Sequence, residues 1–261
     1  MQKTIKLNNK TLTVKIRSDA DESVFNEILV DHDYKILDPI IKNSKNCIID
    51  VGAHIGLFSV YANTLNPNTK IFSFEPELEN YKALKENLQL NHCKNISPKN
   101  LAIGAVEGKQ TLYLSSDSHN HSFLNLNKDI DAAKDNSTQN ISTKTKQTKN
   151  GSINAPQPNP TSISIQTTTL AKILKHDLPK LGIESCDLIK MDCEGAEFEI
   201  IKSIPKGIFS KIKHMYIEYH EYAETLRNAD LKSILEKNGL KVKIFPSYYD
   251  KRIGFLLATN L

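Results

Sequence analysis

The stretch NCIIDVGAHIGLFSVYA, residues 46–62, is the part of this chain best suited to hold a small ligand. Its apolar start ends in Asp50, and Gly52 and Gly56 follow four residues apart. Glycines have no side chain, so backbone amides at the start of a helix can approach a ligand closely. The stretch therefore predicts a strand that turns into a helix around a ligand, although the same turn could also bind nothing.

A second acid narrows the choice of ligand. Glu75 ends the next predicted strand, FSFEP, and is followed by Pro76. An acid at this point can accept hydrogen bonds from both ribose hydroxyls of a nicotinamide or an adenosyl cofactor, or it can simply complement a helix dipole. A dinucleotide site would need Gly-x-Gly-x-x-Gly, but His54 follows Ala53 where the middle glycine would stand. We therefore expect S-adenosylmethionine in this turn, with Asp50 near its cationic amino acid part.

The segment MDCEGAE supplies a cluster of acids. An apolar strand over residues 186–192 is expected to bring Asp192 to the carboxyl edge of a sheet, where open parallel sheets bind ligands. Methyl transfer needs an acceptor oxygen in line with the methyl group and a group that removes its proton. Asp192, which would also meet the cofactor, or Glu194 could do this. The alternative is that Asp192, Glu194 and Glu197 only cap or complement the next helix.

Glu218 and His220 lie two residues apart near the end of another predicted strand, so their side chains share one face at the same edge of the sheet. A histidine near its ordinary pKa suits proton removal at neutral pH. We expect both residues on the acceptor side, against the alternative that the histidine only binds a neighbour or water. His121 and Ser122, in SHNHSFLN, could line the acceptor pocket.

A metal ion is not predicted from these residues. A divalent cation beside Asp192 could lower the pKa of an acceptor hydroxyl, but a hard ion needs several oxygen ligands and the sequence offers only candidates. Two neighbouring histidines without a third matched ligand are weak evidence for a metal site. Metal dependence stays open at this point.

The elements that must position these residues alternate between strand and helix. Residues 1–44 are expected to form a hairpin and a helical lead-in, and residues 45–261 one larger domain. Within that domain, apolar strands alternate with amphipathic helices, which predicts an α/β doubly wound, mostly parallel sheet. The closing strands LKVKIFP and IGFLLATN are joined by a short connection, which predicts an antiparallel hairpin at the C-terminal edge of the sheet.

One segment interrupts this alternation. Residues 128–160 are rich in Asn, Thr, Ser, Lys, Gln and Pro and almost free of large apolar side chains. Such a segment cannot bury enough surface to offset the entropy of ordering it. We expect a flexible insertion, with a lid over the substrate as the alternative.

Composition restricts the class of protein. The 261 residues are 39% apolar with a formal charge of +4, and the basic residues are scattered. This makes a nucleic acid partner unlikely. The four cysteines show no Cys-x-x-Cys pair, and no apolar run approaches the ~20 residues that span a bilayer. We expect a cytoplasmic protein without a membrane span, whose oligomeric state the sequence leaves open.

Five blocks resemble, in order, those of the FkbM-type methyltransferases: IIDVGAHIGLFSVYA, FSFEPELENYKALKENLQLN, NLAIGAVEGKQTLYLS, TTTLAKIL and DLIKMDCEGAEFEIIKSI. The resemblance implies the class I methyltransferase (Rossmann-like) fold with a reversed C-terminal strand, and S-adenosylmethionine as cofactor. It also implies that Asn100, Leu101 and Ala102 meet the adenine. One departure is His54, where the family pattern has Asn.

Together these observations predict an S-adenosylmethionine-dependent methyltransferase that acts on a hydroxyl of a sugar, a glycan or a small metabolite. N-methylation of a protein or nucleic acid is an alternative, although no Asn/Asp-Pro-Pro-Tyr/Phe motif is present. A noncatalytic module that keeps the cofactor fold is a second alternative. A nicotinamide oxidoreductase is a third, disfavoured by the missing glycine.

Overall fold

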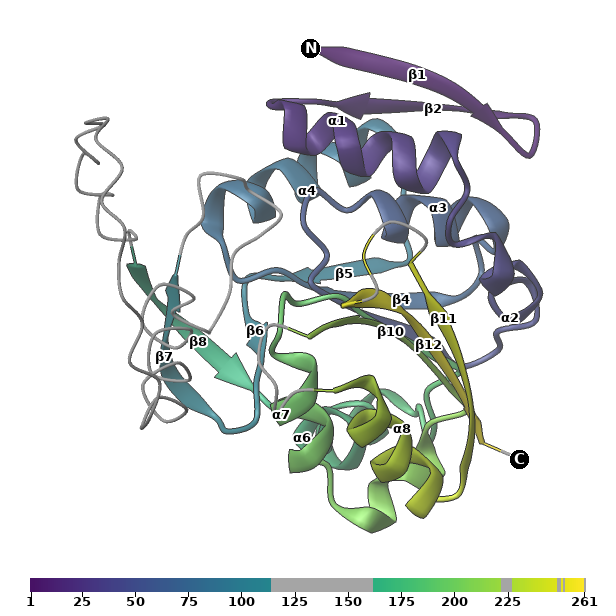
Figure 1. Ribbon diagram of the computed structural model, residues 1–261. Coiled ribbons are helices and arrows are strands. Elements are labelled where there is room, and N and C mark those ends of the chain that lie inside the picture. Colours follow the sequence, from purple (N-terminus) through teal and green to yellow (C-terminus); the bar gives the residue numbers. More distant parts are fainter. Residues whose placement is uncertain (114–161, 222–226, 248–249, 251, 261) are drawn as a thin grey trace, which may run out of the picture.

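The computed structural model describes residues 1–113, 162–221, 227–247, 250 and 252–260 of the chain (Figure 1). The insertion predicted at residues 128–160 lies outside this part, as do His121 and Ser122. The elements that carry all other candidate residues lie within it.

A seven-stranded sheet forms the centre of the fold. It consists of β3 (Cys47–Val51), β4 (Lys70–Phe74), β5 (Ile96–Lys99), β9 (Leu188–Met191), β10 (His214–His220), β11 (Leu240–Pro246) and β12 (Ile253–Asn260). The strand order is β11-β12-β10-β9-β3-β4-β5, with parallel pairing from β10 through to β5. The middle strands β3 and β9 are buried along their whole length, as their continuous apolar sequences predict. The predicted doubly wound sheet is confirmed.

The C-terminal hairpin closes one side of this sheet. β12 pairs antiparallel with both β10 and β11, so the expected reversed strand is present. It lies between β10 and β11, and β11 is therefore the outermost strand. This places Ile253, at the start of β12, opposite His220 at the end of β10.

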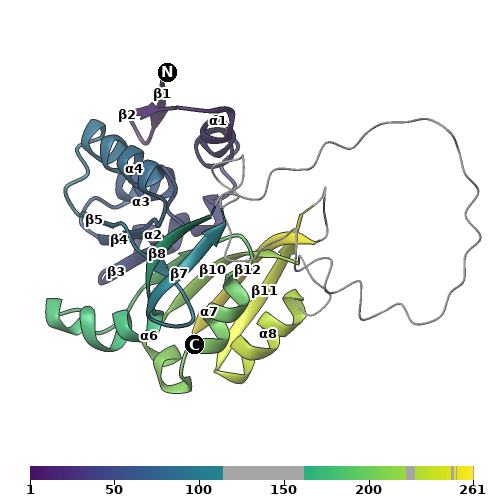
Figure 2. The same ribbon diagram turned by 90° about the vertical axis from the view of Figure 1, so that its left-hand side faces the viewer.

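Helices cover both faces of the sheet (Figures 1 and 2). One layer contains α1 (Asp19–Phe25), the π-helical turn η1 (Asn26–Val30), the 3₁₀ turn η2 (Lys35–Leu37), α2 (Asp38–Lys42), α3 (Leu57–Leu65) and α4 (Leu78–Leu90). The other layer contains α6 (Leu170–Lys172), η3 (Ile173–Asp177), η4 (Pro179–Leu181), α7 (Glu197–Ser203), η5 (Lys206–Lys211) and α8 (Asn228–Lys237). Each layer buries its own apolar cluster against the sheet.

The N-terminal segment is the expected hairpin followed by short helices. β1 (Gln2–Leu7) and β2 (Lys10–Lys15) pair antiparallel, and both turn residues, Asn8 and Asn9, have positive φ. Asparagine tolerates this left-handed conformation better than most residues, and such turns match the twist of a hairpin. The hairpin lies over α1 and α4 rather than apart from the domain (Figure 1).

A small second sheet stands beside the main one. It contains β6 (Ala102–Ile103), β7 (Gly108–Tyr113) and β8 (Ser162–Thr168), in the order β6-β8-β7. Residues 95–105 therefore contribute to both sheets, because β5 belongs to the main sheet and β6 to the small one. β7 pairs antiparallel with β8, a strand that was not predicted from the sequence.

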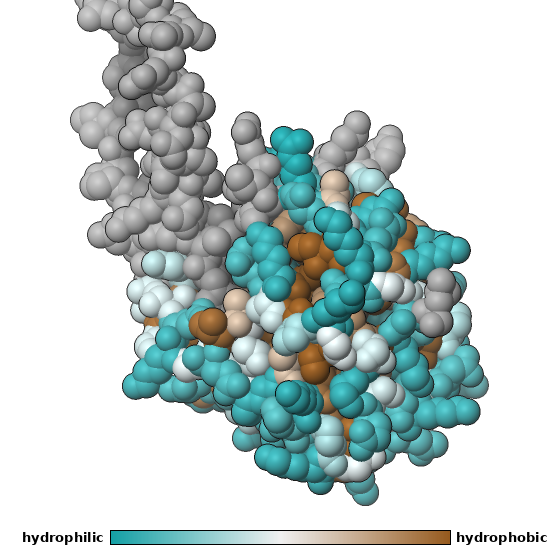
Figure 3. Space-filling model, turned by 90° about the horizontal axis from the view of Figure 1, so that it is seen from below, coloured by the Kyte–Doolittle hydropathy of each residue, from teal (hydrophilic) through white to brown (hydrophobic). Residues whose placement is uncertain are grey.

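The surface on the side of α6, α7 and α8 is mostly hydrophilic, with a strip of apolar side chains across its middle (Figure 3). Exposed large apolar side chains in the described residues include Leu181 and Phe245. Among these residues, no helix combines the length and the apolar character that crossing a membrane requires. The cysteines in this part, Cys47, Cys93, Cys186 and Cys193, are all free thiols, as expected.

Asp187 joins the beginnings of the two middle strands. One of its carboxylate oxygens accepts hydrogen bonds from Ser44 Oγ (2.9 Å) and from the backbone N–H groups of Lys45 (2.8 Å) and Asn46 (2.5 Å). The other accepts from Lys213 Nζ at 2.6 Å. Burial alone would raise the pKa of Asp187, but the hydrogen bonds from Lys213 and Asn46 outweigh it and lower the pKa to about 2.

We expect Asp187→Asn to lower the free energy of unfolding by ~1–3 kcal/mol, because buried donors lose a charged acceptor. Asp187 releases its proton more readily in the folded chain than in the unfolded chain, where its pKa is ~3.9. Its contribution is therefore complete above about pH 4 and is lost as the pH falls towards 2. Denaturant unfolding at several pH values measures both effects. Asp177→Asn, in an exposed pair with Lys172, is the control, and equal losses in the two variants would contradict the prediction.

Candidate active site

The two glycines of the turn between β3 and α3 lie where an added side chain would be crowded. Gly52 has φ +73°, and a Cβ atom there would lie 1.8 Å from the carbonyl oxygen of Asp192. Gly56 has φ +85° at the start of α3, where a Cβ atom would meet Leu84 at 3.0 Å. Both positions require glycine. The first one also brings the turn into direct contact with the end of β9, which carries the acidic cluster.

Glu75 lies between the glycine turn and α4. Its carboxylate is 5% exposed and accepts hydrogen bonds from the backbone N–H of His54 (2.8 Å) and of Glu77 (2.9 Å). Burial raises the pKa of Glu75 to about 8, although these two N–H groups act in the opposite direction. The carboxylate is thus fixed at the carboxyl end of β4, where it can accept hydrogen bonds from a ligand as well.

A cavity of about 280 Å³ opens at this edge of the sheet. The turn and Glu75 form one side, and the acids at the ends of β9 and β10 form the other. The apolar lining comes from the layer with α1, η1 and α3, from the central sheet and from the small sheet, and includes Ile28, Phe58, Phe74, Ile103 and Leu112. Apolar walls with a few convergent polar groups are typical of cofactor sites.

Lys190 is the buried cation of the site. Its side chain is 5% exposed, and Nζ donates to the carbonyl oxygen of Gly52 at 3.1 Å. The same nitrogen lies 3.5 Å from Asp192 Oδ2 and 3.7 Å from Asp50 Oδ1. Burial lowers the pKa of a lysine, but the nearby carboxylates of Asp192 and Asp50 outweigh it and raise the pKa of Lys190. Its ammonium therefore links the glycine turn with both acids.

Asp50 lies beneath the turn and is fully buried. Its carboxylate accepts a hydrogen bond from Ser59 Oγ at 2.6 Å. Burial raises the pKa of Asp50, while Lys190 and Ser59 act against this. We expected Asp50 near the cationic amino acid part of the cofactor. Asp50 does not line the cavity, and it supports the turn through Lys190 and Ser59.

His220 is enclosed by carboxylates. Its Nδ1 lies 3.5 Å from Glu197 Oε1, and its Nε2 lies 3.6 Å from Glu194 Oε2 and 3.9 Å from Glu218 Oε1. Burial disfavours the imidazolium, but Glu197 and Glu194 outweigh it and raise the pKa of His220 to about 10. The expectation of an ordinary pKa for His220 is therefore wrong. An imidazole that is already protonated at neutral pH cannot take up a proton from an acceptor.

Two further acids of the cavity hold protons more tightly than usual. Burial, followed by the charge of Asp192, raises the pKa of Glu218 well above its ordinary value. The same two causes raise the pKa of Glu27, on η1, to about 7. Both groups can therefore be protonated near neutral pH and act as hydrogen-bond donors, whereas a normal glutamate would only accept.

The structure brings together most of the residues that the sequence predicted. The cavity is lined by Gly52, Ala53, His54, Glu75, Pro76, Ala102, Asp192, Glu194, Glu218 and His220. Asn100 and Leu101 do not line it. Asn100 Nδ2 donates to the carbonyl oxygens of Glu75 and Pro76, both at 2.9 Å, and Leu101 packs against the core. These two residues shape the segment after Glu75 and do not meet the ligand pocket.

The cavity is also lined by Lys190, Glu27 and Tyr34, which the sequence did not predict as site residues. Lys190 interrupts an otherwise apolar strand, and a charge at such a position signals a buried partner. Glu27 stands among apolar residues of the lead-in helix and carries a weaker signal of the same kind. The sequence around Tyr34 carries no such signal, because an aromatic residue in an amphipathic segment is usually part of the core.

Three side chains of the site form a candidate set of metal ligands, one of which already binds the backbone. Asp192, Glu197 and His220 offer atoms within 4.8 Å of one another. However, the two oxygens of Glu197 accept hydrogen bonds from the backbone N–H groups of Cys193 and Gly195, each at 2.8 Å. Glu197 thereby fixes the turn before α7, in which Glu194 has φ +53°. The Glu197 carboxylate therefore binds two backbone N–H groups, and these hydrogen bonds account for its position without an ion.

The chain is similar in sequence to known methyltransferases. The family model of the methyltransferase FkbM domain matches residues 50–242. Methyltransferase sdnD of Sordaria araneosa is 28% identical over 227 residues, which cover 84% of this chain and 82% of that protein. AMB antimetabolite synthetase AmbE of Pseudomonas aeruginosa is 25% identical over 232 residues, and this chain spans 11% of its length.

A solved structure was also found. The crystal structure of methyltransferase FkbM from Methylobacillus flagellatus aligns with a TM-score of 0.47 and 16% identity, and the match covers 82% of this chain and 43% of that one.

We expect Lys190→Met to lower the free energy of unfolding by ~3–5 kcal/mol, because it leaves the buried Asp50 carboxylate without its cation. Adding Asp50→Asn should recover part of this loss, since the neutral amide no longer needs a countercharge. Denaturant unfolding measures both variants. Lys202→Met removes an exposed pair with Glu199 and should cost less than ~1 kcal/mol. If Lys190→Met lowers the free energy of unfolding by no more than Lys202→Met does, the role of the ammonium is refuted.

Proposed function

The chain belongs to the FkbM methyltransferase family, and we propose that it transfers a methyl group from S-adenosylmethionine to a hydroxyl of a sugar, glycan or small metabolite. The observation that carries this proposal is that the predicted cofactor-binding residues and the predicted catalytic acid line the same cavity. The glycine turn and Glu75 lie on one side, and Asp192 lies on the other, in contact with Gly52.

The residues present fit an adenosyl cofactor. Glu75 would accept hydrogen bonds from the ribose hydroxyls, and the closely approaching backbone of the turn would face the amino acid part. Phe74, Ile103 and Leu112 offer an apolar wall for the adenine. His54 and Leu57 stand where the motif Gly-x-Gly-x-x-Gly has its second and third glycine, which argues against a dinucleotide.

When bound, S-adenosylmethionine supplies an electrophilic methyl group on a sulfonium. The remaining requirements fall to the protein, which must orient the acceptor hydroxyl, take up its proton and exclude water. Asp192 is the best placed proton acceptor. Its side chain is 28% exposed at the cavity, and its Oδ2 lies 3.5 Å from the Lys190 ammonium, which compensates its negative charge.

The neighbouring groups orient the acceptor and do not deprotonate it. His220 is protonated at neutral pH because its pKa is about 10. It therefore serves as a cation that holds Glu194 and Glu218 in place. Glu218, whose pKa is raised, can donate a hydrogen bond to an acceptor oxygen. This assigns the proton transfer to Asp192 and the orientation of the acceptor to Glu218.

Calorimetric titration with S-adenosylhomocysteine, with NAD⁺ in parallel, tests the cofactor. We expect binding of S-adenosylhomocysteine alone. Transfer of a labelled methyl group from S-adenosylmethionine to a panel of hydroxylated and aminated acceptors then tests the reaction. Binding of NAD⁺ alone would refute the proposal, and labelling of amines alone would redirect it to N-methylation.

We expect Asp192→Asn to lower kcat by about 10²- to 10⁴-fold, the usual contribution of a general base, on the acceptor that the panel identifies. The amide keeps the shape of the side chain but cannot take up the proton. Affinity for S-adenosylhomocysteine should change little in comparison. Glu199→Gln, on the exposed side of α7, is the control. Full turnover of Asp192→Asn would refute its role as the base.

We expect the affinity for S-adenosylhomocysteine to rise with pH and to level off above about pH 8, because ribose hydroxyls prefer the ionised form of Glu75. Below this pKa the carboxyl must release its proton before the ligand binds, which weakens the apparent affinity. Glu75→Gln should remove this pH dependence and should weaken binding at pH 9. The exposed Glu79→Gln variant controls for other titrating groups. An unchanged profile in Glu75→Gln would contradict the prediction.

A further inference from the structure

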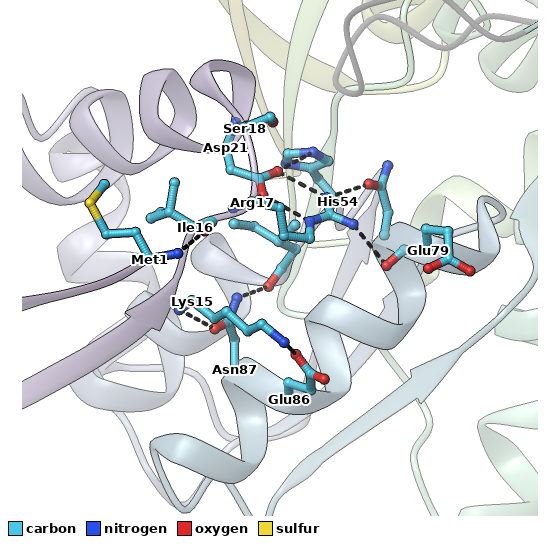
Figure 4. Close-up of polar contacts among 12 residues, drawn as sticks. Met1, Lys15, Ile16, Arg17, Ser18, Asp21, His54, Glu79, Glu86 and Asn87 are labelled. Atoms are coloured by element: carbon cyan, nitrogen blue, oxygen red, sulfur yellow. Dashed lines mark hydrogen bonds and ion pairs between the residues drawn. The ribbon is translucent and has the colours of Figure 1, made fainter.

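A buried carboxylate in the N-terminal segment reaches the glycine turn. Asp21, on α1, is fully buried. It accepts hydrogen bonds from Arg17 at three nitrogens: the backbone N (2.8 Å), Nε (2.8 Å) and one terminal guanidinium nitrogen (2.9 Å). Its Oδ1 also lies 3.3 Å from His54 Nε2. Figure 4 shows Arg17 and His54 converging on this one carboxylate.

Arg17 extends the same network to α4. Its guanidinium donates to the backbone carbonyl of Glu79 at 2.9 Å and to Asn80 Oδ1 at 2.7 Å, both in the first turn of α4 (Figure 4). The network therefore contacts the chain on both sides of Glu75. His54 precedes it in the glycine turn, and the first turn of α4 follows it.

The hairpin strengthens this attachment along α4. The backbone N–H of Lys15 donates to Asn87 Oδ1 at 2.8 Å, and Lys15 Nζ pairs with Glu86 at 2.6 Å (Figure 4). Thr13 N–H donates to Asn91 Oδ1 at 2.9 Å. Residues of α1 and η1 then continue into the cavity wall with Val24 and Ile28.

His54 has a conformation that needs such support. Its φ of 49° lies in the left-handed region, which is unfavourable for most residues other than glycine. Its backbone N–H is one of the donors to the Glu75 carboxylate. If the His54 side chain moved away from Asp21, the backbone of the turn could relax, and the donor to Glu75 would move with it.

We infer that Asp21 is a positioning residue of the cofactor site, which fixes His54 and, through it, the Glu75 carboxylate in the geometry that binds the adenosyl group. The N-terminal segment is then part of the cofactor site and not only a lead-in to the domain. This inference rests on the proposed function, because it takes an adenosyl cofactor as the ligand of the turn.

A double-mutant cycle tests the inference by calorimetric titration with S-adenosylhomocysteine. Asp21→Asn and His54→Asn should each weaken binding about tenfold, which corresponds to ~1.4 kcal/mol. The double variant should bind no more weakly than either single variant, because both changes break the same contact. Asparagine is chosen at position 54 because it tolerates a positive φ but is too short to reach Asp21.

Glu22→Gln is the matched control. Glu22 neighbours Asp21 on α1 and forms a partly exposed ion pair with Lys3 of the hairpin. Its loss should leave the affinity for S-adenosylhomocysteine unchanged. Thermal unfolding without ligand, run on every variant, separates a loss of stability from a loss of cofactor affinity.

The outcomes distinguish the inference from the proposed function. If the unchanged protein does not bind S-adenosylhomocysteine, the proposed function fails and the inference falls with it. If it binds, but folded Asp21→Asn binds within twofold of it or the two effects are additive, only the inference is overturned. If Asp21→Asn does not fold, His54→Asn decides alone, and an affinity within twofold of the unchanged protein overturns the inference.

Discussion

The contact between Gly52 and the end of β9 is the constraint on which the site depends. No side chain fits between the glycine turn and the carbonyl of Asp192, so the part that would hold the cofactor and the part that carries the acids form one unit. Lys190 completes that unit, because its ammonium bonds the turn carbonyl and balances Asp50 and Asp192. A buried lysine is costly alone and becomes stable only among several carboxylates.

Acidic side chains outnumber basic ones at the carboxyl edge of the sheet, and this gives chemically similar groups different protonation states. Burial raises the pKa values of Glu27, Glu75 and Glu218, whereas the carboxylates of Glu197 and Glu194 keep His220 protonated against the effect of burial. Titratable groups whose environments push their pKa values apart commonly mark catalytic centres. In the proposed reaction the group that takes up the proton is Asp192, which lines the cavity beside the Lys190 ammonium.

Much of the site could be predicted because its signals are local. Glycines at fixed spacing, an acid after an apolar strand and the MDCEGAE cluster each occupy a strand end, and parallel strands gather their ends at one edge. The errors concern side chains whose surroundings come from distant segments. Asn100 and Leu101 face away from the cavity, Asp50 lies under the turn, and His220 owes its pKa to carboxylates on the turn before α7 and in α7 itself. The partner strand β8 was missed because its pairing lies across the polar segment.

The sequence by itself determined the alternation of strands and helices in the main sheet, the C-terminal hairpin, the glycine turn and the family. These follow from periodicity and from residues close together in the chain. Only the tertiary structure decided that Lys190 holds the turn and the acids together, and that Asp21 and Arg17 reach His54 and α4. Such contacts join residues up to 138 positions apart. Their strength comes from burial, which the spacing of residues along a chain does not reveal.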